Sequence, residues 1–98
     1  MEVEARADFL RGIPIFAGLP AESIDRIAER AQPRDLHAGE WLFREGDPGD
    51  ALYVLRSGRL EVLQGEHGVI RSIPSGGVLG ELALLTGERR SASVRARR

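Results

Sequence analysis

The length, composition and charge of the chain limit it to one small domain and exclude several classes of function. Its 98 residues are 42% hydrophobic and 30% charged, which is ordinary for a globular domain with a modest core. A formal net charge of −1 provides no general attraction to nucleic acid or to an anionic membrane. The absence of cysteine excludes disulfides, thiolate catalysis and cysteine-ligated zinc. It also fits a reducing compartment, so we expect a cytoplasmic location.

Neither a membrane span nor a signal peptide is expected. The longest apolar runs, such as residues 52–55 and 82–85, are far shorter than the roughly 20 residues of a transmembrane helix. The N-terminus reads MEVEARADFL, which has an acidic start and no long apolar stretch. We therefore expect no membrane insertion.

The first third of the chain has the periodicity of helices. Pro20 suits the first turn of a helix, and Pro33 ends that helix because its ring disfavours helical geometry at the preceding residue. Between them, apolar residues recur at the spacing of one helical face: Ile24, Ile27, Ala28 and Ala31. Before Pro20, a short helix and an apolar cluster are predicted from Phe9, Leu10, Ile13, Ile15 and Phe16. We assign residues 1–33 to an N-terminal helical segment.

From residue 34 onward the pattern changes to short strands separated by turns. The expected strands are residues 41–43, 51–57, 59–64, 69–73 and 91–97. Breaks rich in glycine, proline and aspartate separate them, as at residues 46–50. In the last three expected strands apolar and polar residues alternate, which is typical of strands with one buried face. Residues 34–98 therefore predict a mainly β fold, an antiparallel double-stranded β-roll or jelly roll.

Residues 79–94, LGELALLTGERRSASV, do not fit a plain strand. Gly80 allows a sharp turn, and a short helical turn after it would present unpaired N–H groups to an anion. An arginine that faces these N–H groups would complete a phosphate-binding site through charge-assisted hydrogen bonds. Glu81 would be repelled by a phosphate unless it accepts hydrogen bonds from a sugar hydroxyl of the same ligand. Together these features suggest a nucleotide with a free ribose hydroxyl.

The same run resembles the phosphate-binding cassette of the cyclic-nucleotide-binding family, which includes the bacterial catabolite activator protein and kinase regulatory subunits. The family pattern is an apolar residue, Gly-Glu, any residue, a small residue and an apolar residue, then a short gap, Arg, a small residue and Ala. The matching positions are Leu79, Gly80, Glu81, Leu82, Ala83 and Leu84, followed after five residues by Arg90, Ser91 and Ala92.

A second signature of this family lies upstream. Residues 42–49 read LFREGDPG, residues 52–55 read LYVL, and Gly58 follows. Phe43 departs from the pattern, because a smaller apolar residue is usual there. The resemblance covers nearly the whole chain and implies a β-roll with N-terminal helices and a short helix in the cassette. The family's last strand and C-terminal helices, which cover the base, are missing, so we expect a fragment of a longer protein.

The resemblance implies roles for the residues of the cassette. Glu81 accepts the ribose 2′-hydroxyl, and Gly80 lies close to the sugar. The backbone N–H groups of Leu82 and Ala83 hold the phosphate, and Arg90 pairs with an exocyclic phosphate oxygen.

Four further residues complete the expected ligand-binding set. Ser91 and the backbone of Ala92 add phosphate contacts. Val62 matches a strand position that packs against the base, and Arg71 is expected to line the same pocket.

Simpler interpretations compete at several of these positions. Glu81 and Arg90 could form an exposed ion pair that contributes little. Arg89 has the same chemistry as Arg90, but only Arg90 immediately precedes the Ser-Ala of the pattern, so we expect Arg89 to be solvated. The three aromatic residues of the β segment, Trp41, Phe43 and Tyr53, are expected in the core or an interface rather than stacked on a base.

No catalytic or metal site is expected. His37 and His67 are isolated, and two lone histidines do not make a metal centre. This also argues against a metal-dependent enzyme on a similar roll, and the serines lack a matching His-Asp arrangement. We therefore expect no cofactor other than the ligand itself.

The favoured function is a regulatory sensor that binds a 3′,5′-cyclic nucleotide and relays the signal to an effector domain outside this chain. Among relatives of the family, serine after the cassette arginine occurs in cAMP-responsive bacterial activators, so Ser91 favours cAMP over cGMP. Residues 49–54 and 57–60 resemble sensor domains of patatin-like esterases. The alternative is a degenerate β-roll that acts as an interaction module without ligand. Apolar surface exposed in a fragment would also permit a homodimer.

Overall fold

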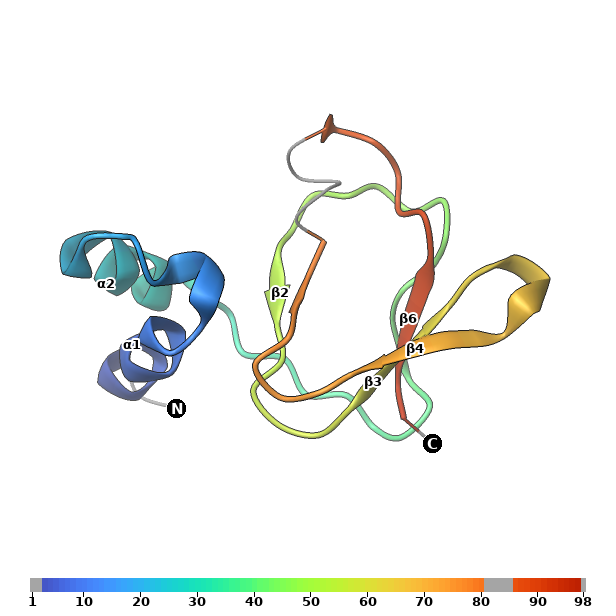
Figure 1. The fold of residues 1–98 in the computed structure, drawn as a ribbon, viewed down its shortest axis with the longest axis horizontal. Coiled ribbons are helices and arrows are strands. Elements are labelled where there is room, and N and C mark those ends of the chain that lie inside the picture. The colour runs from blue at the N-terminus through green and yellow to red at the C-terminus, as the bar shows by residue number, and fades with distance from the viewer. Residues whose placement is uncertain (1–2, 81–85, 98) are drawn as a thin grey trace. The chain divides into compact units, whose positions relative to one another are not determined.

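The computed structural model describes residues 3–80 and 86–97. The chain divides into two compact units, Met1–Asp35 and Leu36–Arg98. The first unit is helical and the second contains all the described strands (Figure 1). Within the described residues, no helix combines the length and the apolar composition that a membrane crossing requires.

The helical unit consists of three short helices whose apolar sides meet. They are α1 (Val3–Arg11), the 3-10 helix η1 (Pro14–Phe16) and α2 (Ala21–Arg30). The buried apolar side chains are Ala7, Leu10, Ile13, Phe16, Ile24 and Ala28. Helix α2 begins directly after Pro20, as expected from the fixed φ of proline. The guanidinium of Arg6 donates to the carbonyl oxygens of Ala28 (3.3 Å) and Ala31 (3.1 Å). These carbonyls lie at the C-terminal end of α2, where no further backbone N–H groups of the helix are available to them.

The predicted apolar face of this unit is too wide. Ile15 is 54% exposed and Ile27 is 36% exposed, so neither belongs to the core. Ala31 lies beyond the end of α2 in extended backbone and is exposed. The reason is that two short helices bury only a narrow stripe of each other, whereas periodicity marks every apolar residue on one side.

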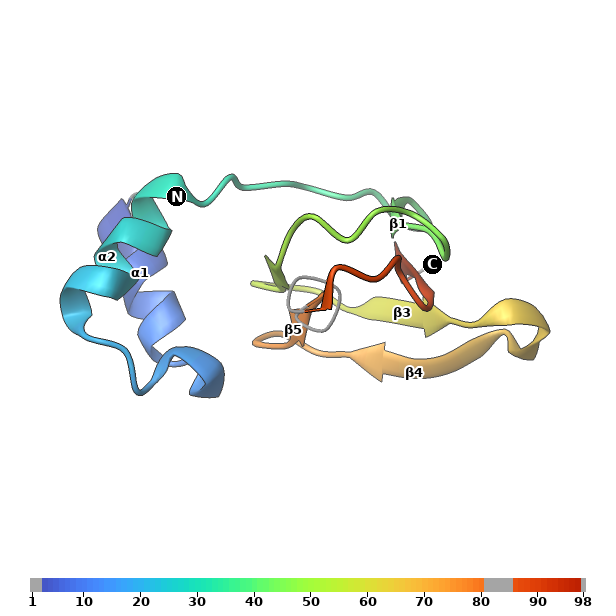
Figure 2. The same ribbon diagram turned by 90° about the horizontal axis from the view of Figure 1, so that it is seen from above.

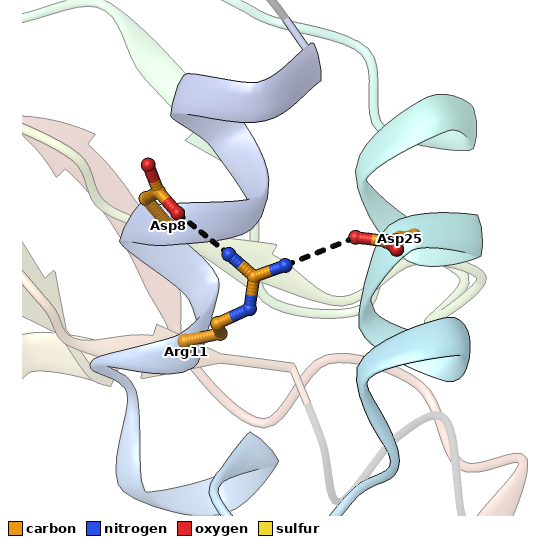
Figure 3. A network of polar contacts seen from close by, with 3 residues as sticks. All are labelled: Asp8, Arg11 and Asp25. Carbon is orange, nitrogen blue, oxygen red and sulfur yellow. Dashed lines mark hydrogen bonds and ion pairs between the residues drawn. The ribbon is translucent and has the colours of Figure 1, made fainter.

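One exposed arginine links the two α-helices (Figure 3). Arg11 Nη1 donates to Asp8 Oδ1 one turn earlier in α1, and Arg11 Nη2 lies 3.2 Å from Asp25 Oδ1 of α2. All three side chains are at least 43% exposed, so water screens both pairs and their contribution to stability is small.

The β unit is built from two antiparallel sheets, which confirms the predicted mainly β roll (Figures 1 and 2). The larger sheet has the order β1-β6-β3-β4, and the smaller one pairs β2 with β5. The strands are β1 (Trp41–Phe43), β2 (Tyr53–Val54), β3 (Leu60–Leu63), β4 (Val69–Ile73), β5 (Val78–Leu79) and β6 (Ser93–Ala96). The 3-10 helix η2 (Gly65–His67) joins β3 to β4. The short helix predicted in the cassette lies outside the described residues.

Alternation along β3 and β6 builds the core of this unit. Its buried members are Leu60, Val62, Ile73, Leu79, Val94 and Ala96. The expected alternation fails in β4, where only Ile73 is buried, while Val69 is 45% and Ile70 48% exposed. Strand β4 lies at one edge of the sheet and pairs with β3 alone (Figure 2). Its side chains therefore have fewer neighbours.

A bulge in β1 decides which way its side chains face. Trp41 is opposite Arg95 of β6, but Phe43 is opposite Val94, so two steps along β1 match one step along β6. Trp41 therefore shares the outer face with Arg95, whose guanidinium lies 5.4 Å from the indole centroid. Phe43 turns instead to the inner face, where the buried Val94 lies. Bulges of this kind commonly re-aim a side chain beside a functional site.

Candidate functional site

A pocket of about 220 Å³ lies in the β unit. Four of its lining residues form one row across the larger sheet. They are Phe43 of β1, Val94 of β6, Val62 of β3 and Arg71 of β4, each paired with the next. The remaining described lining residues are Val78, Leu79, Gly80, Thr86, Glu88, Arg89, Arg90, Ser91 and Ala92. Three of the lining residues are arginines and one is a glutamate, so the described wall favours an anion.

Arg90 is the buried charge of this pocket, with only 5% of its surface exposed. Its backbone is tied to the turn after β1, since its N–H donates to Asp47 O and its carbonyl accepts from the N–H of Gly46, both at 2.8 Å. Its side chain donates from Nη2 to Ala51 O at 2.8 Å. Its Nε and Nη1 have no hydrogen-bond partner among the described residues. Buried donors without partners are costly, so these two N–H groups have the capacity to bind an anionic acceptor.

Two aromatic rings support the same guanidinium. Arg90 Cζ lies 4.2 Å from the ring centroid of Phe43 and 5.7 Å from that of Tyr53. Both rings also pack against the core of the β unit, where the sequence predicted them. Sequence reasoning missed their contact with Arg90. The one hint was that Phe43 departs from the smaller residue usual at its position.

Gly80 makes room for the arginine. Its φ is +87°, a left-handed conformation that side chains disfavour. A Cβ atom at this position would lie 2.4 Å from Arg90 Nη1 and 2.8 Å from Ala51 O. A glycine is therefore required here both by backbone conformation and by space.

The chain around Arg90 is anchored by its neighbours. Arg89 is exposed and donates from Nη1 to Gly46 O at 2.9 Å. Gln64 Nε2 donates to Ser91 O at 3.1 Å, which links the end of β3 to the segment after Arg90. The N–H of Glu45 donates to Ser93 Oγ at 2.8 Å. These bonds hold residues 89–93 in one place beside the pocket.

The described members of the expected ligand-binding set all line this one pocket. They are Val62, Arg71, Gly80, Arg90, Ser91 and Ala92. The other three, Glu81, Leu82 and Ala83, lie outside the described residues. Sequence reasoning did not single out Val78, Val94, Thr86 or Glu88, which also line it. The roles of the whole set in binding remain predictions.

A match over the same β unit identifies the family. A family model described as the cyclic nucleotide-binding domain matches residues 33–98, about two thirds of the chain. The chain belongs to the cyclic nucleotide-binding domain family. The prediction from the two sequence signatures is therefore confirmed, and the pocket with its buried arginine lies within the matched residues of the domain.

Relatives of this cyclic nucleotide-binding domain occur in longer proteins. It is similar to an uncharacterised NTE family protein of Mycobacterium bovis, with 38% identity over 91% of the chain and 15% of that protein. It is also similar to a cAMP-dependent protein kinase regulatory subunit of Emericella nidulans, with 40% identity over 91% of the chain and 22% of that protein. The chain thus spans less than a quarter of these curated relatives.

A solved structure shows the same fold with a ligand. The regulatory domain of Toxoplasma gondii PKA, crystallised with cAMP, matches 97% of this chain and 38% of its own with a TM-score of 0.89. Sequence identity between the two is 25%.

Proposed function

We propose that the chain is a regulatory sensor module that binds a 3′,5′-cyclic nucleotide and passes the signal to an effector domain of a larger cytoplasmic protein. The observation that carries the proposal is Arg90, a buried guanidinium that lines the pocket of the β unit and has two donors without a partner among the described residues. Membership of the cyclic nucleotide-binding domain family supports the ligand class. The module itself needs no catalytic group for this role.

The pocket offers chemistry for each part of such a ligand. The cyclic phosphate would accept hydrogen bonds from Arg90, in a site where burial strengthens the attraction between the two charges. Apolar side chains of Val62 and Val94 would lie against the uncharged parts of the ligand. Glu81 would accept the ribose 2′-hydroxyl, as the family pattern implies.

The relay requires two states with different affinities. A ligand shifts a conformational equilibrium only by as much as it prefers one state over the other. The segment that carries Arg90 is hydrogen-bonded to the turn at Gly46 and Asp47. A displacement of Arg90 on ligand binding would therefore also displace the loop between β1 and β2. We propose this loop as part of the route to the effector domain.

We propose cAMP as the ligand rather than cGMP. Ser91 follows the cassette arginine and lines the pocket, and the family resemblance associates serine at this position with cAMP-responsive activators. One observation favours cGMP as a second candidate. Arg71 also lines the pocket and is exposed there, and an arginine can donate two hydrogen bonds to O6 and N7 of guanine.

Replacing Arg71 by glutamine separates these two ligands. If Arg71 reads guanine, Arg71→Gln should weaken cGMP binding by about 1–3 kcal/mol and leave cAMP binding nearly unchanged. Arg56→Gln is the matched control, because Arg56 is exposed, carries the same charge and does not line the pocket. An equal loss for both nucleotides in Arg71→Gln would mean that Arg71 contributes only its positive charge.

Calorimetric titration of the chain with cAMP, cGMP and 5′-AMP tests the proposed function. We expect saturable binding of cAMP, weaker binding of cGMP and none of 5′-AMP, which lacks the cyclic phosphate. If none of the three nucleotides binds, the result would favour the alternative of a ligand-free interaction module or homodimer. Val69 and Ile70, exposed on the edge strand β4, offer apolar surface for that alternative.

A further inference from the structure

Within residues 3–80 and 86–97, the Arg90 guanidinium contacts two aromatic rings and a backbone carbonyl, and no carboxylate pairs with it. Its guanidinium lies over the ring of Phe43 at 4.2 Å and donates from Nη2 to Ala51 O. The ion pairs among the described residues join other arginines, Arg11 and Arg95, to acidic side chains. The positive charge of Arg90 is therefore not neutralised by any described side chain.

The β1 bulge is what aims the Phe43 ring at Arg90. Without the bulge, Phe43 would share the outer face with Trp41, because residues two apart on a regular strand point the same way. The bulge instead sets Phe43 opposite Val94, on the pocket side. Tyr53 of β2 closes the arrangement, with its ring centroid 5.9 Å from that of Phe43 and 5.7 Å from the guanidinium carbon.

An aromatic support has a consequence for anion binding that a carboxylate support lacks. An aromatic ring contacts the flat face of the guanidinium. The N–H groups, which lie in the plane of the guanidinium, therefore stay available for hydrogen bonds. Phenylalanine has no acceptor that would compete for those donors, and it carries no negative charge that would repel a phosphate. Stacking also removes rotamer freedom from the long arginine side chain before the ligand arrives, which lowers the entropic cost of binding.

We propose that Phe43, with Tyr53, is a positioning residue that holds the Arg90 guanidinium with its free donors available to the phosphate of the ligand. Gly80 completes the arrangement, since the missing Cβ leaves the space that Arg90 Nη1 occupies. The inference rests on the proposed function, because it explains how the same pocket positions Arg90 before the phosphate of the ligand binds.

The test compares three variants of the full chain in calorimetric titrations with cAMP. Phe43→Leu keeps an apolar side chain but removes the ring, and we expect its Kd to rise roughly three- to thirtyfold. Phe43→Tyr restores a ring and should bind close to the unsubstituted chain. Ile73→Val is the matched control, because Ile73 is buried in the same core but does not line the pocket. It should lower the free energy of unfolding without changing the Kd.

A second readout needs no ligand. The Arg90 Nε–H signal in a proton–nitrogen NMR spectrum should be shifted by the ring current of Phe43 and protected from exchange by burial. Phe43→Leu should abolish the shift and speed the exchange, whereas Ile73→Val should change neither.

The outcomes separate this inference from the proposed function. A Kd for Phe43→Leu equal to that of the unsubstituted chain, or an equal rise of the Kd in Ile73→Val, would overturn the positioning role. If the unsubstituted chain does not bind cAMP, the proposed ligand is wrong. The NMR comparison then still decides whether Phe43 holds the guanidinium, and an unchanged Nε–H signal in Phe43→Leu would overturn that as well.

Discussion

Replacing Arg90 by alanine is expected to remove most of the affinity for a cyclic nucleotide. Removing one partner of a desolvated, hydrogen-bonded charge pair costs about 2–5 kcal/mol. That loss corresponds to a Kd raised roughly thirtyfold to several thousandfold. The size of the effect follows from burial, because a phosphate in this pocket would lose its hydration without gaining the guanidinium. Calorimetric titration measures the change, and thermal unfolding checks that the variant remains folded.

Two comparisons make the Arg90 result specific. Arg89→Ala removes the same charge from an adjacent, exposed side chain, so its effect on the Kd should be much smaller. Arg90→Lys keeps the charge but replaces the planar set of donors by a single ammonium, so its loss should lie between the other two. Equal losses in Arg89→Ala and Arg90→Ala would show that the pocket responds only to net charge.

Gly80→Ala is expected to have the second largest effect, on stability as well as on binding. The new Cβ would lie 2.4 Å from Arg90 Nη1 and 2.8 Å from Ala51 O. The arginine can move away, but the carbonyl of Ala51 can move only together with the backbone around it, which costs about 1–3 kcal/mol. The left-handed φ of +87° adds roughly 1–2 kcal/mol for a residue with a side chain. Displacement of the guanidinium should at the same time raise the Kd for cAMP.

Gly58→Ala provides the matched control for this substitution. Gly58 also has a φ of +87°, but a Cβ there would meet nothing within 4 Å. The difference between the two free energies of unfolding in urea therefore measures the clash alone. We expect Gly58→Ala to leave the Kd unchanged, and an equal loss of stability in both variants would contradict the steric role assigned to Gly80.

Local chemistry explains why much of the fold could be predicted. Pro20 marks the start of α2 because proline fits the entry of a helix. Alternation in β3 predicts that Leu60 and Val62 are buried while Glu61 and Leu63 are less so, and the structure has this pattern. Strands β1 and β4 have the predicted bounds, Trp41–Phe43 and Val69–Ile73, because turn-forming residues follow each of them.

The two-residue strands were predicted poorly. Strand β2 has only two residues, Tyr53–Val54, where residues 51–57 were expected, and β5 (Val78–Leu79) was not predicted. Two residues carry no alternation, so only the pairing of Tyr53 with Leu79 and Val54 with Val78 defines these strands. That pairing joins segments distant in the chain, which local periodicity does not report.

The sequence by itself determined the family, the class of fold and a candidate set of binding residues, because these depend on motifs and on patterns within short segments. The motif also predicted that Arg89 is solvated, and Arg89 is exposed. Only the tertiary structure decided that Arg90 is buried against an aromatic ring, and that Phe43 faces the pocket. The physical reason is that burial and side-chain direction depend on what lies opposite a residue. Here, the bulge between β1 and β6 and the missing Cβ of Gly80 together create the space in which one arginine is held.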